Sequence, residues 1–190
     1  MRNTFIILFT CLFMATFAQN GKTGAEKFWE NLKAHCGKSY EGVITVGGVE
    51  GDGFTGEKLT MQVLSCEENR IRIPFNVGEN YSRTWIITKL PCGKLKLKHD
   101  HRNPDGTDDE VTMYGGTATH TGTSTMQIFP ADQETLDLID YAIGNLWWFT
   151  LDENHFTYNL RRVHTDRLFT VTFDLKNPIE SQPKPWGWRE

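Results

Sequence analysis

Several classes of protein are excluded by what this sequence lacks. It has no long run of Lys and Arg, and its formal net charge at pH 7 is −4, so no basic surface for nucleic acid is expected. It has no phosphate-binding loop, nucleophile elbow or Ser–His–Asp pattern, and therefore no motif that names a reaction. Its four cysteines include no CxxC pair, which removes the usual sign of a zinc ribbon or a thioredoxin-like site.

Only one long hydrophobic run is present, and it lies at the start of the chain. Residues 5–17, FIILFTCLFMATF, follow the positive charge of Arg2 and end beside the small residue Ala18. The run is short for a membrane span, and this order of features is typical of a secretory signal peptide. We therefore expect residues 1–18 to be a signal peptide. Residues 19–190 should form one secreted or periplasmic domain, without stable membrane insertion after cleavage.

Helical spacing of apolar residues occurs in two segments. In residues 24–36, GAEKFWENLKAHC, the apolar side chains share one side, and Gly37 provides a stop. A second helix is predicted near residues 132–143, where Asp132 can act as the N-cap. The sequence thus predicts one helix before the strands and one inserted among them.

The rest of the chain consists of short segments in which apolar and polar residues alternate. Examples are EKLTMQVLSC, RIRIPF, YSRTWIITKL, KLKLKHDHR, HFTYNLRR and RLFTVTFDL. Such segments, separated by turns at regular spacing, are typical of antiparallel strands in a sandwich or barrel. We count about ten and predict a mainly β fold, a single antiparallel up-and-down β-barrel. Residues 176–190, rich in Pro and Trp, are expected to pack against it as an extended tail.

Two resemblances agree with this fold. The segment FWENLKAHCGKSYEGVI resembles the opening of lipocalin-like (calycin) barrels, in which an apolar helix precedes a glycine and an aromatic residue entering the first strand. The chain also resembles a family of small secreted bacterial proteins, through the segments IRIPF, SRTW, LKHDHR, MYGG, FPAD, FDL and PWG. That resemblance implies a lipocalin-like barrel and an extracytoplasmic compartment, and it brings no established activity.

Three cysteines remain after the signal peptide. Cys36 lies just before the first strand and Cys66 ends the second, so an up-and-down meander brings both to the same end of one hairpin. A Cys36–Cys66 disulfide is therefore predicted, with Cys92 as the remaining thiol. Because Cys92 lies in the next turn at that end, a Cys66–Cys92 pair is the alternative.

The segment LKLKHDHR carries the main functional signal. Side chains alternate across a strand, so His99 and His101 should face the barrel interior together with Leu95 and Leu97. The opposite face, which contains Lys96, Lys98, Asp100 and Arg102, should face solvent. Both histidines are expected near the barrel mouth, at the end opposite the cysteines.

Neighbouring segments should add further side chains to this end. Arg83 and Trp85 are two residues apart, so both should point into the barrel. Tyr81 should lie beyond Arg83, nearer to the mouth. In the segment after the histidines, Val111 and Met113 are expected to face inwards, which places Asp109 near the mouth. The candidate ligand-binding residues are therefore His99, His101, Arg83, Tyr81, Trp85 and Asp109.

Three interpretations of the histidines compete. A His-x-His pair can supply two metal ligands, and GKLKLKHDH resembles the opening of the first cupin motif. However, the expected glutamate is missing at its usual spacing, since Glu110 lies too far beyond His101. Alternatively, the histidines and Arg83 line a pocket for a small, partly apolar and possibly anionic ligand. Third, both histidines are structural and are hydrogen-bonded inside the barrel without any ligand.

Overall fold

The computed structural model describes residues 21–189, so the predicted signal peptide lies outside the described residues. It contains the helices α1 (Gly24–Lys33) and α2 (Gln133–Leu138) and the 3-10 helix η1 (Asp140–Gly144). The strands are β1 (Ser39–Val46), β2 (Leu59–Gln62), β3 (Ser65–Cys66), β4 (Arg70–Val77), β5 (Asn80–Lys89), β6 (Leu95–His101), β7 (Tyr114–Thr117), β8 (Met126–Pro130), β9 (Asn145–Leu151), β10 (His155–Arg162) and β11 (Leu168–Asp174). No helix within residues 21–189 is long and apolar enough to cross a membrane.

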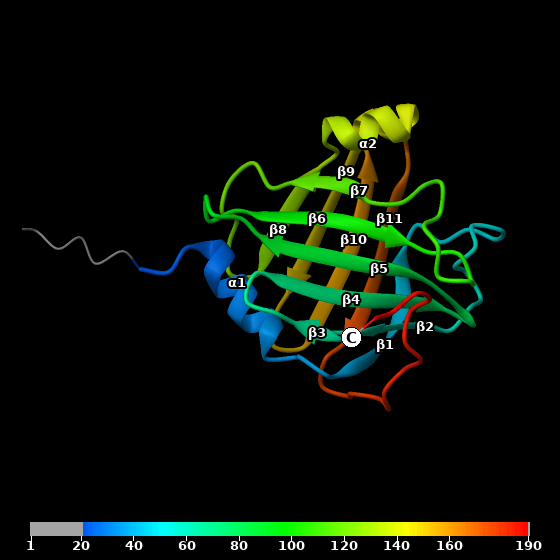
Figure 1. The fold of residues 1–190 in the computed structure, drawn as a ribbon, viewed down its shortest axis with the longest axis horizontal. Coiled ribbons are helices and arrows are strands. Elements are labelled where there is room, and N and C mark those ends of the chain that lie inside the picture. The colour runs from blue at the N-terminus through cyan, green and yellow to red at the C-terminus, as the bar shows by residue number, and fades with distance from the viewer. Residues whose placement is uncertain (1–20, 190) are drawn as a thin grey trace, which may run out of the picture.

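The strands form one antiparallel sheet that curls back on itself. Their order is β7-β6-β5-β4-β2-β1-β11-β10-β9-β8, and the short β3 pairs only with β4. Strand β1 pairs with β11, which joins the first part of the chain to the last. Figure 1 shows β4 to β7 crossing in front of β8 to β11. The prediction of a mainly β, antiparallel, lipocalin-like barrel of about ten strands is therefore confirmed.

Helix α1 packs its apolar side onto the barrel, as the spacing predicted. A capping box between Thr23 and Glu26 starts the helix, which satisfies backbone N–H groups of its first turn. The helix ends at Lys33, so Cys36 lies in the following turn rather than in the last helical turn. Its buried side chains are Ala25, Phe28, Trp29 and Leu32.

The Cys36–Cys66 disulfide is present, with a Cα–Cα distance of 6.2 Å, and Cys92 is an exposed free thiol. The bond links the turn after α1 to β3, so it fixes the helix to one end of the barrel. Disulfides persist mainly in oxidising compartments, and the bond is consistent with an extracytoplasmic protein.

Strands β7 and β8 complete the barrel through two glycines. In the part of the chain that the structure describes, no strand ladder joins them. Instead the carbonyl of Gly115 accepts hydrogen bonds from the Asp132 N–H at 2.9 Å and the Thr135 hydroxyl at 2.8 Å. At Gly116, a Cβ atom would lie 1.7 Å from the carbonyl oxygen of Pro130. The glycines of the MYGG segment thus allow β7 to approach the end of β8.

Helix α2 covers part of the outer face of β6, which corrects one prediction. Lys98 does point away from the barrel interior, but it is 5% exposed rather than solvated. Its ammonium group contacts the carboxylates of Asp132 at 2.8 Å and Glu134 at 2.7 Å. Asp132 is also the N-cap of α2, as predicted, and accepts a hydrogen bond from the Thr135 N–H. Sequence alternation identified the face of Lys98 but not the helix that covers it.

We expect the substitution Asp132→Ala to destabilise the protein by about 3 kcal/mol, because it removes a helix cap and one partner of a buried ammonium group. Glu134→Gln is the matched control, since the Glu134 side chain is 77% exposed, and it should cost less than about 1 kcal/mol. Urea unfolding measures both variants. Equal losses of unfolding free energy in the two variants would show that Asp132 stabilises the protein no more than the exposed Glu134 does.

The segment after β11 runs along the outside of the barrel without regular secondary structure. Figure 1 shows it crossing in front of the sheet near β2 and β4. Ile179 forms an isolated β-bridge with Ser39. The backbone N–H of Trp186 donates a hydrogen bond to the Tyr81 carbonyl at 3.0 Å. Trp188 stacks against the Arg72 guanidinium, 4.1 Å from the ring centroid. These contacts place the tail on the outer wall, away from the barrel interior.

Candidate functional site

The inner face of β6 changes from leucine to histidine towards the barrel mouth. Leu95 and Leu97 are fully buried and His99 is 3% exposed, while His101 is partly exposed. The neighbouring strand β5 pairs Trp85 with His99 and Arg83 with His101. The predicted inward parity of these residues agrees with the register.

His99 has partners for both ring nitrogens. Its Nδ1 lies 3.2 Å from the Tyr114 carbonyl oxygen, and its Nε2 lies 3.1 Å from the Tyr158 hydroxyl. Since a carbonyl can only accept, Nδ1 carries the proton and donates, and Nε2 accepts from the hydroxyl. Burial lowers the pKa of His99 to about 3. His99 is therefore neutral at physiological pH and its hydrogen bonds are satisfied within the protein.

His101 lies one step nearer to solvent and is less constrained. Its Nε2 is 3.1 Å from the Tyr114 hydroxyl, and its backbone N–H donates to the Thr112 hydroxyl. Burial, followed by the charge of Arg83, lowers the pKa of His101 to about 4. At neutral pH it can offer a hydrogen bond to a ligand, but not a positive charge.

Arg83 is the positive charge of the inner part of this site, whereas Arg162 and Arg167 border its outer part. Its guanidinium lies over the Phe54 ring, 5.2 Å from the centroid, and makes one long hydrogen bond, at 3.4 Å, to the Ser82 hydroxyl. Among residues 21–189, no carboxylate lies within 4.0 Å of this guanidinium. Burial lowers the pKa of Arg83, partly opposed by nearby tyrosines and Asp109. A partly buried guanidinium without a carboxylate partner is an unusual arrangement, because buried charges are normally paired.

Two adjoining cavities meet at these side chains. The inner cavity has a volume of about 120 Å³ and the outer one, at the mouth, about 240 Å³. We refer to the two together as the mouth pocket. Phe54, His101, Tyr114 and Tyr158 line both parts. The inner part adds Phe75, Arg83, Thr84, Trp85 and His99, whereas the outer part adds Asp109, Val111, Trp147, Arg162 and Arg167 among others.

Most of the remaining interior is filled by aromatic rings. Trp85 stacks on Phe75 at 4.8 Å and on Tyr158 at 4.6 Å between ring centroids. Phe149, Phe156 and Phe173 surround this stack and are fully buried. The mouth pocket therefore has room for a small molecule, and the rings leave little room for a long chain.

The other predicted site residues are placed as follows. Asp109 lines the outer part of the pocket, and its N–H donates to the His101 carbonyl at 3.1 Å. Trp85 forms the wall of the inner part. Tyr81 does not line either part. Its ring instead packs edge-to-face against Trp186 of the tail, with 6.5 Å between ring centroids. The structure thus brings five of the six candidates together and leaves Tyr81 at the edge.

Val111 borders the outer part of the mouth pocket but does not face the barrel interior, and the prediction that Met113 faces inwards was wrong. They are 41% and 42% exposed, while Tyr114 points inwards and stacks on His99 with 4.6 Å between ring centroids. Met113 has a φ of 58°, in the left-handed region, and residues 110–113 do not belong to a strand, so the parity argument did not apply to them. Strand β7 accordingly begins only at Tyr114.

Sequence reasoning also missed Phe54. It is the only aromatic residue in the glycine-rich loop 47–58, and its ring contacts Phe75 and Phe169 inside the mouth. An isolated aromatic residue among glycines and polar residues was the available signal, since a lone apolar side chain in a loop often anchors it. This loop connects β1 to β2.

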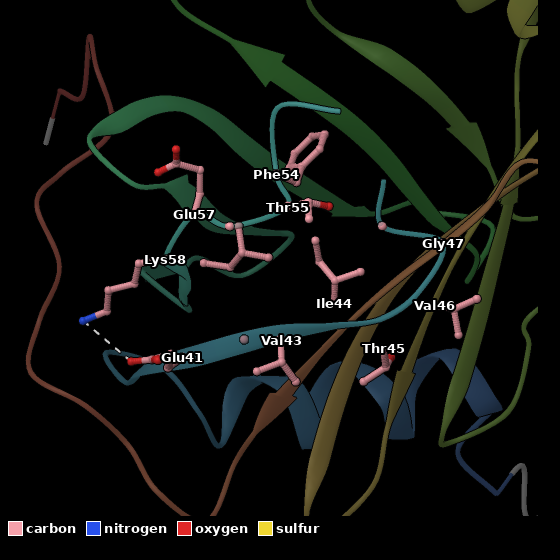
Figure 2. Close-up of a pocket in the computed structure, with 14 residues that line it drawn as sticks. Glu41, Val43, Ile44, Thr45, Val46, Gly47, Phe54, Thr55, Glu57 and Lys58 are labelled. Atoms are coloured by element: carbon pink, nitrogen blue, oxygen red, sulfur yellow. Dashed lines mark ion pairs between the residues drawn. The ribbon is translucent and has the colours of Figure 1, made fainter. Parts of the chain in front are cut away.

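The same loop also borders a groove of about 810 Å³ along β1. Strand β1 pairs with β2 only from Ser39 to Gly42, so its second half faces the loop across open space. Figure 2 shows this groove with Ile44 and Val46 on one side and Phe54, Thr55 and Glu57 on the other. Phe54 lines the groove as well as both parts of the mouth pocket.

Metal coordination requires more ligands than the histidine pair offers. Structural and catalytic zinc sites use at least three protein ligands, and residues 21–189 contain no group of three or more His, Cys, Asp or Glu side chains placed to hold a metal ion. Both ring nitrogens of His99 are already hydrogen-bonded, one to the Tyr114 carbonyl and the other to the Tyr158 hydroxyl. No observation at this site favours a metal over an organic ligand.

Comparison of the chain with protein-family models, with curated proteins and with solved structures gave no match in any of the three.

Proposed function

We propose that the protein binds a small organic anion in the mouth pocket, with Arg83 pairing with the anionic group. The observation that carries this proposal is the partly buried guanidinium, which has no carboxylate within 4.0 Å among residues 21–189. Arginine recognises carboxylates and related groups through paired N–H donors. The surrounding aromatic rings supply the apolar walls that such a ligand requires.

The histidines contribute polarity rather than charge. Both are neutral at pH 7, because burial lowers their pKa values to about 3 and about 4. His99 donates to the Tyr114 carbonyl and accepts from the Tyr158 hydroxyl, whereas His101 lies in both parts of the pocket and can hydrogen-bond to the ligand. We also propose that the protein works outside the cytoplasm, in the secreted or periplasmic compartment expected for the small lipocalin-like proteins that its sequence resembles.

Thermal unfolding with paired ligands tests this proposal. Each small carboxylic acid is compared with its own amide, which has a similar shape but no charge. We expect carboxylates to raise the Tm and amides to have little effect, because only the charged form pairs with Arg83. The substitution Arg83→Met should weaken carboxylate binding by about 10- to 100-fold, the value of a charge-assisted hydrogen bond.

The matched control is Arg70→Met, on the outer face of β4, where the guanidinium pairs with Glu67. This variant should retain wild-type binding. The proposal is wrong if amides raise the Tm as much as carboxylates do. It is also wrong if Arg83→Met and Arg70→Met bind carboxylates with the same affinity.

A further inference from the structure

Phe54 is the last ring of a parallel aromatic stack. Tyr158, Trp85 and Phe75 come from β10, β5 and β4, and neighbouring rings are 4.6 and 4.8 Å apart with interplanar angles of 16° and 15°. Phe54 continues this order, 6.1 Å from Phe75 with an interplanar angle of 16°. Three rings of the stack are thus fixed on strands, whereas the fourth is supplied by a loop.

The Phe54 ring lies next to both the end of this stack and Arg83, the only charge of the inner cavity. Its centroid is 6.1 Å from that of Phe75 and 5.2 Å from the Arg83 guanidinium, and these two residues are themselves paired across β4 and β5. A phenyl ring attracts a cation weakly through its π face, but it cannot neutralise it. The position therefore suits a flat ring that also carries a negative charge, and Phe54 provides only the ring.

The loop that carries Phe54 is organised mainly by itself. The Asp52 carboxylate accepts hydrogen bonds from the backbone N–H groups of Val49, Phe54 and Thr55, which lowers the Asp52 pKa to about 2. Gly51, Gly53 and Gly56 have positive φ, and no atom lies within 4 Å of the Cβ position of any of them. Segments with few contacts open more readily than the core, and the groove in Figure 2 offers space beside the ring.

We propose that Phe54 is an internal plug that occupies the place of the ligand's ring, and that the ligand is an aromatic carboxylate. On binding, the ligand ring stacks on Phe75 in place of Phe54, and its carboxylate pairs with Arg83. This inference rests on the proposed anion site and adds to it the class of ligand and the element that moves.

Calorimetric titration of the full chain with benzoate and with cyclohexanecarboxylate tests the inference. The two acids have the same charge and similar size, but only benzoate can stack. Wild-type protein should bind benzoate about three- to tenfold more tightly, the usual gain from an aromatic pair. Phe54→Ala should bind benzoate at least about tenfold more tightly than wild type. In the wild type, only the fraction of molecules in which Phe54 has left its place can bind the ligand.

Two further variants keep the test independent of folding. Phe54→Leu retains an apolar side chain in the slot, and its benzoate affinity should lie between those of wild type and Phe54→Ala. Val49→Ala changes an exposed residue of the same loop and should leave the affinity unchanged.

The inference is overturned if Phe54→Ala or Phe54→Leu weakens benzoate binding, which would make Phe54 a wall of the site. It is also overturned if cyclohexanecarboxylate binds as tightly as benzoate. In either case, carboxylate binding that is lost in Arg83→Met would leave the anion site standing. If no variant binds either acid, the inference and the proposed function both fail.

Discussion

The free energy of unfolding should fall steeply as the pH is lowered from 6.5 to 5. Burial lowers the pKa of His99 to about 3 and that of His101 to about 4, from an ordinary value of 6.5. Below pH 6.5 the unfolded chain therefore binds protons that the folded protein does not, and stability is lost until the pH reaches the folded pKa values. Each histidine contributes up to about 1.4 kcal/mol per pH unit. Above pH 6.5 the unfolded histidines also lose their protons, so this dependence fades as the pH rises further.

Other groups affect this pH window less. His35 acts in the same direction, since burial also lowers its pKa. The carboxylates with lowered pKa, such as Asp52 and Asp132, lose their contribution only below their own unfolded values, near pH 4. The loss between pH 6.5 and 5 is thus mainly a property of buried histidine.

Urea unfolding at pH 7.5, 6.5, 5.8 and 5 measures the effect. The double variant His99→Gln, His101→Gln should be less stable at pH 7.5 but should show a much flatter pH dependence than wild type. His120→Gln, at an exposed position, is the control and should keep the wild-type slope. A wild-type stability that stays constant down to pH 5 would mean that the two imidazoles are accessible to protons.

The substitution Gly116→Ala should destabilise the barrel by about 3 kcal/mol, at the upper end of overpacking effects. A Cβ atom at Gly116 would lie 1.7 Å from the Pro130 carbonyl oxygen and 2.8 Å from the carbonyl carbon. Both are backbone atoms, so no side-chain rotation can relieve the overlap. Strand β7 must then move away from the end of β8, and the hydrogen bonds between Gly115 and Thr135 must lengthen.

This movement should also disturb the mouth pocket, because Tyr114 begins the same strand and stacks on His99. Chemical unfolding measures the stability, and carboxylate binding measures the pocket. Gly21→Ala is the matched control, since no atom lies within 4 Å of its Cβ position, and its stability should change by less than about 0.5 kcal/mol. If Gly116→Ala is as stable as this control, the close approach of β7 to Pro130 is not what completes the barrel.

Alternation was sufficient to predict the walls of the barrel. Leu95, Leu97 and His99 are buried as their parity required, and the strand order brought Arg83 opposite His101. The up-and-down arrangement also placed Cys36 near Cys66. These predictions succeeded because a strand with one buried face fixes the side of every residue in it.

The predictions failed where the backbone leaves that pattern. Met113 adopts a positive φ and residues 110–113 are not in a strand, so parity did not fix which of their side chains face inwards. Lys98 is covered by α2, a contact between segments distant in sequence. Phe54 reaches the pocket from a loop, where no periodicity indicates the direction of a side chain. Sequence patterns therefore brought together five of the six candidate residues, but they did not indicate that Phe54 and Tyr114 also line the pocket.

A crystal structure of the protein with saturating benzoate tests the central claim most directly. We predict that the carboxylate lies within hydrogen-bonding distance of the Arg83 guanidinium and that the ring stacks on Phe75, with Phe54 displaced towards the groove. Benzoate bound elsewhere, with Arg83 still over the Phe54 ring, would contradict the account.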